Sequence, residues 1–227
     1  MSFDMAVRLT EMLLGWAFIQ QSAEHFYTSI NRRALFVVRL LLSAVLVLGL
    51  YPQWICVALL LVSVVMLIRF HGPYNGGSDR MGLLILFCLT LAQLLPAQKW
   101  REYALGYLAL QLVLSYCIAG WVKVVNPDWR SGRALRDVFL FSAYPASEGM
   151  RAWAQHPRPM LALSWAVMIF ELLFPFTVLN RETLLVGLIV AAVFHLANAC
   201  LFGLNRFFWA WLAAYPSILW LQERIFR

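Results

Sequence analysis

The amino-acid sequence predicts an all-α fold, a polytopic transmembrane helix bundle. Of its 227 residues, 63% are hydrophobic and only 13% are charged, whereas a soluble domain keeps about a quarter of its residues charged. Several apolar runs reach the roughly 20 residues that a helix needs to cross the hydrocarbon core of a bilayer. Segments of about ten residues with alternating polarity, which are typical of a transmembrane β-barrel, are absent from the sequence.

The apolar runs predict about eight membrane helices. The first run is the least apolar, because Glu11, Gln20 and Glu24 fall within it. This helix is expected either to pack inside the bundle or to lie at the membrane interface. The short turn at Tyr51-Pro52 predicts that the second and third helices form an antiparallel hairpin. The predicted helices cover about residues 6–25, 34–51, 53–70, 81–96, 103–125, 159–179, 183–203 and 206–222.

Two polar stretches interrupt the apolar runs. The longer one, residues 126–157, begins at Asn126-Pro127, and proline disfavours helical geometry in the residue before it, so the fifth helix is expected to end there. Within this stretch, about residues 132–142 are expected to form a short amphipathic helix on the membrane surface. The other stretch, residues 69–80, contains a proline and paired glycines, and a non-helical loop is predicted for it.

The net charge of +7 comes from 18 Lys and Arg residues that are scattered through the predicted loops. Such residues orient membrane helices and contact lipid headgroups, so the lipid bilayer is the expected partner. No basic run interleaved with aromatic residues occurs, and nucleic acid is therefore excluded as a partner. The four cysteines lack a CxxC spacing and predict neither a disulfide nor a metal site. Because no internal repeat is visible, residues 1–227 are expected to form one domain.

Several polar side chains fall inside the predicted helices, where a charge costs several kcal/mol and needs a partner or a purpose. Glu171 is the most unusual of them and lies four residues before Pro175. His195 and Asn198 are three residues apart, so they share one face of the seventh predicted helix. Lys123 lies within the last turn of the fifth.

A structural interpretation accounts for each of these residues. Glu171 would pair with Arg39 or His195 and fix the arrangement of the bundle. His195 and Asn198 would form hydrogen bonds across helices, contacts worth about 1 kcal/mol in membranes. Lys123, at a helix end, would extend to lipid headgroups.

A functional interpretation places Lys123, Glu171 and His195 around one polar cavity. A desolvated lysine can act as a base, and a neighbouring histidine or carboxyl group can relay its proton. Trp129 and Arg130 would line a site for a planar ligand by stacking or cation–π contact. The candidate catalytic residues are thus Lys123, Glu171 and His195, and the candidate cofactor-binding residues are Trp129, Arg130 and Asn198.

One segment, from Tyr116 to Leu135, reads YCIAGWVKVVNPDWRSGRAL. It resembles the signature of the HTTM family, the horizontally transferred transmembrane proteins related to vitamin K-dependent γ-carboxylase. The resembling positions in it are Tyr116, Ala119, Gly120, Lys123, Trp129, Gly132, Ala134 and Leu135. Further stretches agree in the same order, namely Asn75–Asp79, Phe170–Pro175, Phe194–Asn198 and Gly203–Phe207. The resemblance covers nearly the whole chain.

In the carboxylase, the lysine three residues after such an Ala-Gly is the proposed base that deprotonates reduced vitamin K. The resemblance therefore implies a base at Lys123 and a quinone-like, reduced vitamin K-like cofactor. The sequence departs from the carboxylase by one additional residue between Lys123 and Trp129, and no extramembrane domain for a protein substrate is expected. Glutamate carboxylation itself is thus not the expected activity. The resemblance extends to small bacterial HTTM proteins that are needed to mature an exported peptide toxin of the sporulation-delaying type.

These observations predict a bacterial protein that is integral to the inner (plasma) membrane. Its predicted function is that of a modification or maturation factor, which acts on a lipid-soluble, quinone-like cofactor or on a peptide substrate, with Lys123 as the base. The alternative is a non-enzymatic accessory protein that binds and stabilises a peptide or membrane-protein partner. A channel or transporter is disfavoured, because the sequence has no inverted repeat.

Overall fold

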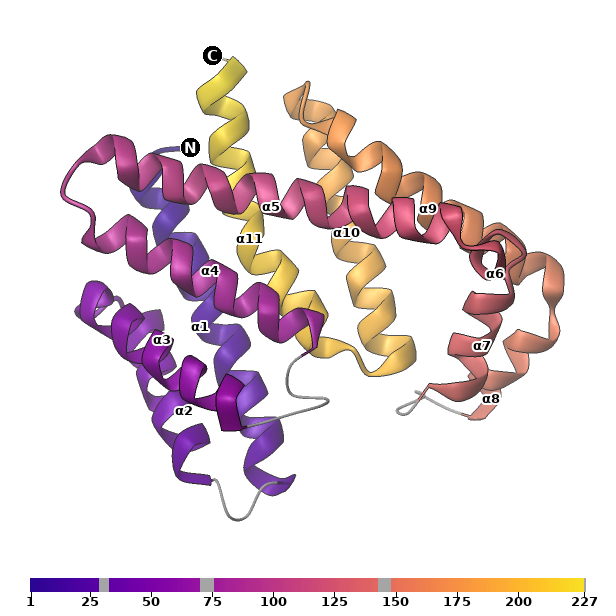
Figure 1. The fold of residues 1–227 in the computed structure, drawn as a ribbon, viewed down its shortest axis with the longest axis horizontal. Helices are drawn as coiled ribbons and strands as arrows, with labels where there is room; N and C mark the ends of the chain where they lie inside the picture. The colour runs from indigo at the N-terminus through magenta and orange to yellow at the C-terminus, as the bar shows by residue number, and fades with distance from the viewer. Residues whose placement is uncertain (29–32, 70–75, 143–147, 227) are drawn as a thin grey trace. The chain divides into compact units, whose positions relative to one another are not determined.

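The computed structural model describes residues 1–28, 33–69, 76–142 and 148–226, and in these ranges the chain forms helices and no strand (Figure 1). Each apolar run that the sequence singles out is one long helix. The α-helices are α1 (Phe3–Thr28), α2 (Arg33–Leu48), α3 (Pro52–Arg69), α4 (Gly77–Leu94), α5 (Gln98–Val125), α6 (Pro127–Arg130), α7 (Arg133–Phe141), α8 (Glu148–Arg151), α9 (Pro157–Thr177), α10 (Arg181–Phe202) and α11 (Asn205–Phe226). A short 3-10 helix, η3 (Ala152–Gln155), follows α8.

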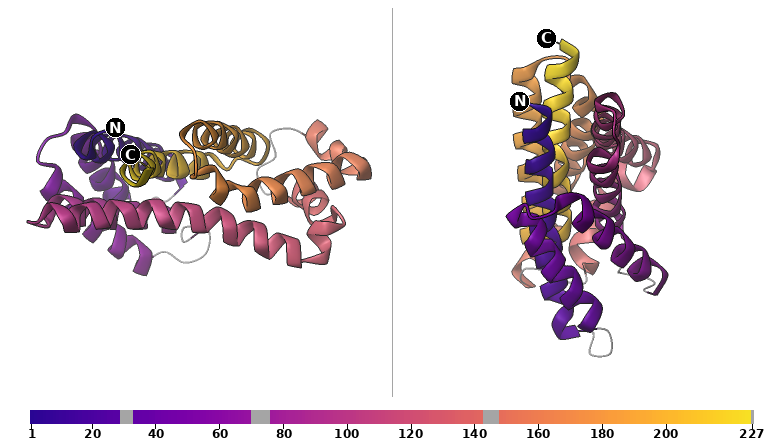
Figure 2. Two further views of the ribbon diagram at one scale, coloured as in Figure 1. Left: turned by 90° about the horizontal axis from the view of Figure 1, so that it is seen from above. Right: turned by 90° about the vertical axis from the view of Figure 1, so that its left-hand side faces the viewer.

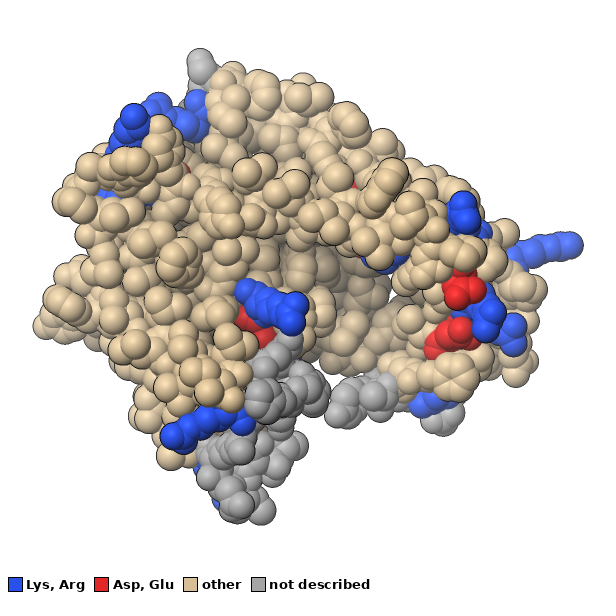
Figure 3. All heavy atoms as spheres, in the orientation of Figure 1, with Lys and Arg blue, Asp and Glu red and all other residues tan. Residues whose placement is uncertain are grey.

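The helices identify the protein as integral to a membrane. Within the described residues, five helices are long and apolar enough to cross a bilayer: α3, α4, α5, α9 and α10. Their large apolar side chains remain exposed along much of their length, and most atoms on the face shown in Figure 3 belong to uncharged residues. The predicted all-α membrane fold is therefore confirmed. The count of about eight spans stays a prediction, because α1, α2 and α11 fall outside this set of five.

The contacts divide the chain into two compact units. Unit 1 contains residues 1–110 and 206–227, and unit 2 contains residues 111–205. Helix α5 is one continuous helix whose first half belongs to unit 1 and whose second half belongs to unit 2 (Figure 2). The expectation of a single domain over residues 1–227 stays a prediction.

Helix α1 packs inside unit 1, which decides between its two predicted placements. Its carboxyl group at Glu11 is only 2% exposed. Arg8 donates a hydrogen bond to this carboxylate over 3.1 Å, and Gln93 of α4 donates another. The Arg8 guanidinium also donates to two carbonyls in the last turn of α2, at Leu46 and Val47. Arg8 thus holds α1 against α2, and Glu11 holds it against α4.

In unit 2, the described residues of the polar stretch between α5 and α9 form short helices. Helix α7 is the predicted amphipathic helix, and its buried side chains join a small apolar cluster made of Leu135, Phe139, Ala154, Met160 and Phe202. The loop before α4 is shorter than the sequence predicts, because α4 already begins at Gly77 instead of residue 81. Residues 70–75 of the predicted loop, with Asn75 of the family signature, lie outside the described residues.

Candidate functional site

The site is built on the second half of α5. Tyr116, Gly120 and Lys123 lie on one face of this helix, because residues four and seven positions apart align along it. The helix ends at Val125, and Asn126 then caps α6 by accepting a 2.9 Å hydrogen bond from the backbone N–H of Asp128. Pro127 occupies the first helical position of α6, where its missing N–H leaves no unmade bond. The chain therefore turns directly after Lys123.

Gly120 lets α9 approach this face of α5 closely. A Cβ atom at Gly120 would lie 3.0 Å from the Glu171 Cβ, and equally close to the backbone nitrogen and the Cγ of Leu172. Such distances are shorter than normal van der Waals contact, so α9 lies directly against the backbone of α5 at this point. The close approach brings Glu171 within reach of Lys123, one turn further along α5.

Replacement of Gly120 by alanine is expected to destabilise the protein. Alanine favours a helix by about 1 kcal/mol over glycine, but here its methyl group would push α5 from α9, at a cost of about 1–3 kcal/mol. Gly106→Ala is the matched control on the same helix, since its Cβ would meet Leu221 at an ordinary 3.6 Å. Thermal unfolding in detergent should show a lower midpoint for Gly120→Ala only. Equal midpoints for the two variants would show that the helices do not touch at Gly120.

Lys123 and Glu171 form an ion pair inside unit 2. The Lys123 Nζ lies 2.7 Å from Oε1 and 2.6 Å from Oε2 of Glu171, so the ammonium group bridges both carboxylate oxygens. The side chains are only 18% and 4% exposed. Because a lone charge at membrane depth is costly, each group provides the neutralising partner that the other requires.

The indole ring of Trp129 covers the ammonium group of this pair, with its centroid 5.3 Å from the Lys123 Nζ. The backbone around Trp129 is fixed to α9. Ser164 donates a 2.5 Å hydrogen bond to the Trp129 carbonyl, and the indole N–H of Trp165 donates to the Arg130 carbonyl over 3.1 Å. The cation–π contact therefore depends on side chains that α9 supplies.

Gly132 also allows the chain after Trp129 to pack closely against α9. Its φ of +77° is in the left-handed region, and a Cβ atom there would lie 2.9 Å from the backbone of Leu161. The glycine thus permits both the turn between α6 and α7 and the close contact with α9. The glycines of the family-like segment, Gly120 and Gly132, have the same structural consequence, which is to hold α9 against the chain on either side of Lys123.

His195 of α10 contacts Tyr116 of α5. Tyr116 precedes Lys123 by seven residues on the same helix. The Tyr116 hydroxyl and the His195 Nε2 are 2.9 Å apart, and both side chains are buried. The Tyr116 ring also packs against Phe174 of α9, with 4.2 Å between ring centroids, and against Phe170 at 5.7 Å. Three helices of unit 2 therefore meet around Tyr116, inside an aromatic cluster.

A comparison with protein families identifies the chain. The family model described as the HTTM domain matches residues 25–222. The chain belongs to the HTTM domain family. It is thus a membrane protein of the vitamin K-dependent carboxylase-like family. No curated protein and no solved structure matches it significantly.

The HTTM match spans all six residues that the sequence proposes for the site, and the structure brings three of them into contact. Lys123 contacts both Glu171 and Trp129. The partner of Glu171 is thus Lys123, whereas the sequence suggested Arg39 or His195. Arg39, in unit 1, instead places its guanidinium 3.9 Å from the centre of the Phe18 ring.

The other three residues lie around this contact without joining it. His195 is hydrogen-bonded to Tyr116, a contact that the sequence interpretation missed. The spacing of seven residues between Tyr116 and Lys123 was the available signal. Arg130 contributes its backbone carbonyl, and its side chain is exposed. Asn198 is half-buried one turn after His195, and no hydrogen bond of its side chain to the other candidates occurs in the described part of the chain.

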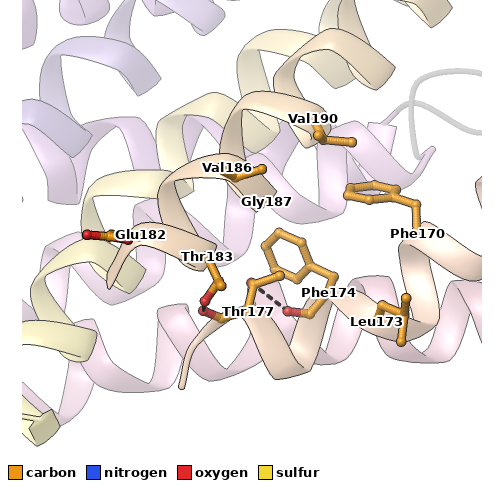
Figure 4. Close-up of a pocket in the computed structure, with 9 residues that line it drawn as sticks. All are labelled: Phe170, Leu173, Phe174, Thr177, Glu182, Thr183, Val186, Gly187 and Val190. Atoms are coloured by element: carbon orange, nitrogen blue, oxygen red, sulfur yellow. Dashed lines mark hydrogen bonds between the residues drawn. The ribbon is translucent and has the colours of Figure 1, made fainter. Parts of the chain in front are cut away.

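An apolar groove of about 520 Å³ lies between α9 and α10 of the HTTM domain (Figure 4). The rings of Phe170 and Phe174 line it from α9, and Val186 and Val190 line it from α10. Phe174 therefore contacts the groove and also the Tyr116 ring. Because both helices are candidate membrane spans, the groove is accessible to molecules dissolved in the hydrocarbon core. No group of three or more potential metal-binding side chains occurs in the described ranges.

Proposed function

We propose that this HTTM protein is a membrane-embedded modification or maturation factor. It acts on a lipid-soluble, quinone-like cofactor or on a peptide substrate, and the Lys123–Glu171 pair moves the proton. The observation that carries the proposal is the contact of a lysine with both oxygens of a buried carboxylate at the end of an apolar helix. This arrangement holds two titratable groups at one point in an environment that otherwise excludes charge.

The pair supplies the two states that acid–base chemistry requires. In the ion pair, Lys123 carries the proton and cannot accept another. Transfer of that proton to Glu171 over the 2.6 Å contact leaves a neutral amine and a neutral carboxylic acid, with no change in net charge. The amine then has a lone pair for a substrate proton, and Glu171 holds the displaced one.

The residues present fit a flat apolar ring with an ionisable hydroxyl group. The face of Trp129 lies beside the amine, and an apolar groove adjoins the Tyr116 cluster in the same unit. A bound hydroquinone would supply an acidic hydroxyl group and redox chemistry that no side chain provides. The chain's own contribution is to exclude water, to hold the Lys123 amine in place, and to accept a proton at Nζ.

The groove between α9 and α10 is expected to enrich a quinone over bulk lipid. Val190→Trp would fill the groove from α10 and should reduce this enrichment. Val193→Trp is the matched control, because Val193 is an exposed valine of the same helix that does not line the groove. The measurement is mass spectrometry of the molecules that co-purify with each protein in mild detergent.

Retention of the quinone in the control and its loss in Val190→Trp would support a lipid-soluble cofactor. Quinone at the same ratio to lipid in all proteins would contradict it. A co-purifying polypeptide without quinone would favour the accessory role, in which the protein binds and stabilises a partner. The proposed location remains the bacterial inner membrane, where such quinones and exported peptides meet.

A further inference from the structure

A second groove lies in unit 1. It runs between the first half of α5 and the second half of α11, and its volume is about 880 Å³. Both helices belong to unit 1, so the groove is a feature of one compact unit. The proposed function does not use any of its lining residues.

One end of this groove is charged. Lys99 and Glu102 line it from the beginning of α5, and Arg224 lines it from the end of α11. Glu102 and Arg224 form an ion pair of 3.4 Å, in which the Arg224 side chain stays 64% exposed. Lys99, also exposed, lies 5.6 Å from the centre of the Tyr103 ring. Two cations facing one carboxylate leave this end with an excess of positive charge.

The other end of the groove is apolar. It is formed by Gly106 and Leu110 of α5 together with Trp220 and Leu221 of α11. Gly106 has no side chain, and a Cβ atom there would face the side chains of Trp220 and Leu221 at 4.0 and 3.6 Å. Because Gly106 has no side chain, the groove stays open at the point where its lining changes from polar to apolar.

The length of the groove corresponds to one leaflet of a bilayer. The lining residues on α5 run from Gln98 to Leu110, and a rise of 1.5 Å per residue makes this stretch about 18 Å long. Half of the hydrocarbon core is about 15 Å thick. Tyr103 lines the groove between its charged and apolar ends, where aromatic residues mark the membrane interface.

We infer that this groove binds one anionic phospholipid. The phosphate lies at Lys99 and Arg224, and one acyl chain follows the apolar floor past Gly106 towards Leu110. The excess of positive charge favours an anionic headgroup over a zwitterionic one. The change from charged rim to apolar floor over the thickness of one leaflet suits a lipid rather than a water-soluble anion.

The test is native mass spectrometry of the full chain, stripped of lipid in detergent and then supplied with phosphatidylglycerol or phosphatidylcholine. The wild-type protein is expected to retain one phosphatidylglycerol in preference to phosphatidylcholine. Gly106→Leu should lose it, because the new side chain occupies the floor of the groove. Ile118→Phe, an enlargement at an exposed position of α5 that does not line the groove, should retain it.

Lys99→Gln and Arg224→Gln provide a test that does not depend on how Gly106→Leu folds. Each should reduce the preference for phosphatidylglycerol about fivefold, the effect expected of one basic residue near an anionic lipid surface. Equal retention of both lipids by the wild-type protein would overturn the inference, since it would indicate general surface lipid. Unchanged preference in both glutamine variants would overturn it as well.

Discussion

Lys123→Met and Glu171→Leu are each expected to lower the stability of the protein strongly, while the double variant recovers most of the loss. Each single change leaves one charge without its partner in a buried position, at a cost of about 3–5 kcal/mol. The double change replaces the pair with apolar side chains of similar size, which is often neutral or stabilising in buried sites. The measurement is the thermal unfolding midpoint of the four proteins in the same detergent.

Comparison of the four unfolding midpoints shows whether Lys123 and Glu171 interact. Recovery in the double variant demonstrates that the two side chains interact, because independent sites would give additive losses. A double variant that is as unstable as the sum of the two singles would show that Lys123 and Glu171 are not paired. The stable double variant is also expected to lack activity, since it has no proton acceptor, and it therefore separates folding from chemistry.

Lys123→Arg is expected to abolish activity while it preserves the fold. Arginine keeps the positive charge and forms two parallel hydrogen bonds with a carboxylate, so the pair with Glu171 remains. Its guanidinium group stays protonated under all ordinary conditions and cannot accept a substrate proton. A general base contributes about 10²–10⁴-fold to a rate, and a loss of this size is expected.

The assay for this prediction is oxygen uptake after addition of a hydroquinone to the protein in lipid nanodiscs. Oxidation of the hydroquinone transfers two electrons and two protons to oxygen, giving the quinone and hydrogen peroxide, and removal of the hydroxyl proton permits the transfer. The matched control is Lys99→Arg, because lysine occurs in this sequence only at positions 99 and 123. A Lys123→Arg protein with the wild-type rate would exclude Lys123 as the base and favour the accessory role.

The helices could be predicted because their signal is simple. Apolar runs of sufficient length determine where membrane helices form, and each predicted run is one long helix in the structure. The beginning of α4 differs from the prediction because Gly77-Ser78 start the helix, although glycine usually marks a turn. The placement of α1 could not be chosen from sequence, because it depends on whether Glu11 finds partners such as Arg8 and Gln93.

The candidate site residues could be named from the sequence, but the contacts among them could not. Polar side chains are easily recognised in apolar helices, and Lys123, Glu171 and His195 were therefore predicted as candidate catalytic residues. Which of them are in contact depends on how closely α5 and α9 approach each other. Gly120 permits the close approach because it has no side chain. Tyr116 was missed as the partner of His195, because a tyrosine in a membrane helix is ordinary until the structure shows what its hydroxyl contacts.

The most direct test of the buried Lys123–Glu171 pair uses the two lysines of the chain. Reductive methylation of the protein in lipid nanodiscs, followed by peptide mass spectrometry, reports how readily each lysine reacts. Lys99 is exposed, whereas Lys123 lies against Glu171 and the Trp129 ring. The pair predicts that Lys99 is methylated while Lys123 is protected, and that Glu171→Gln increases methylation at Lys123. Equal methylation of both lysines in the folded wild-type protein would contradict the pair and the function proposed for it.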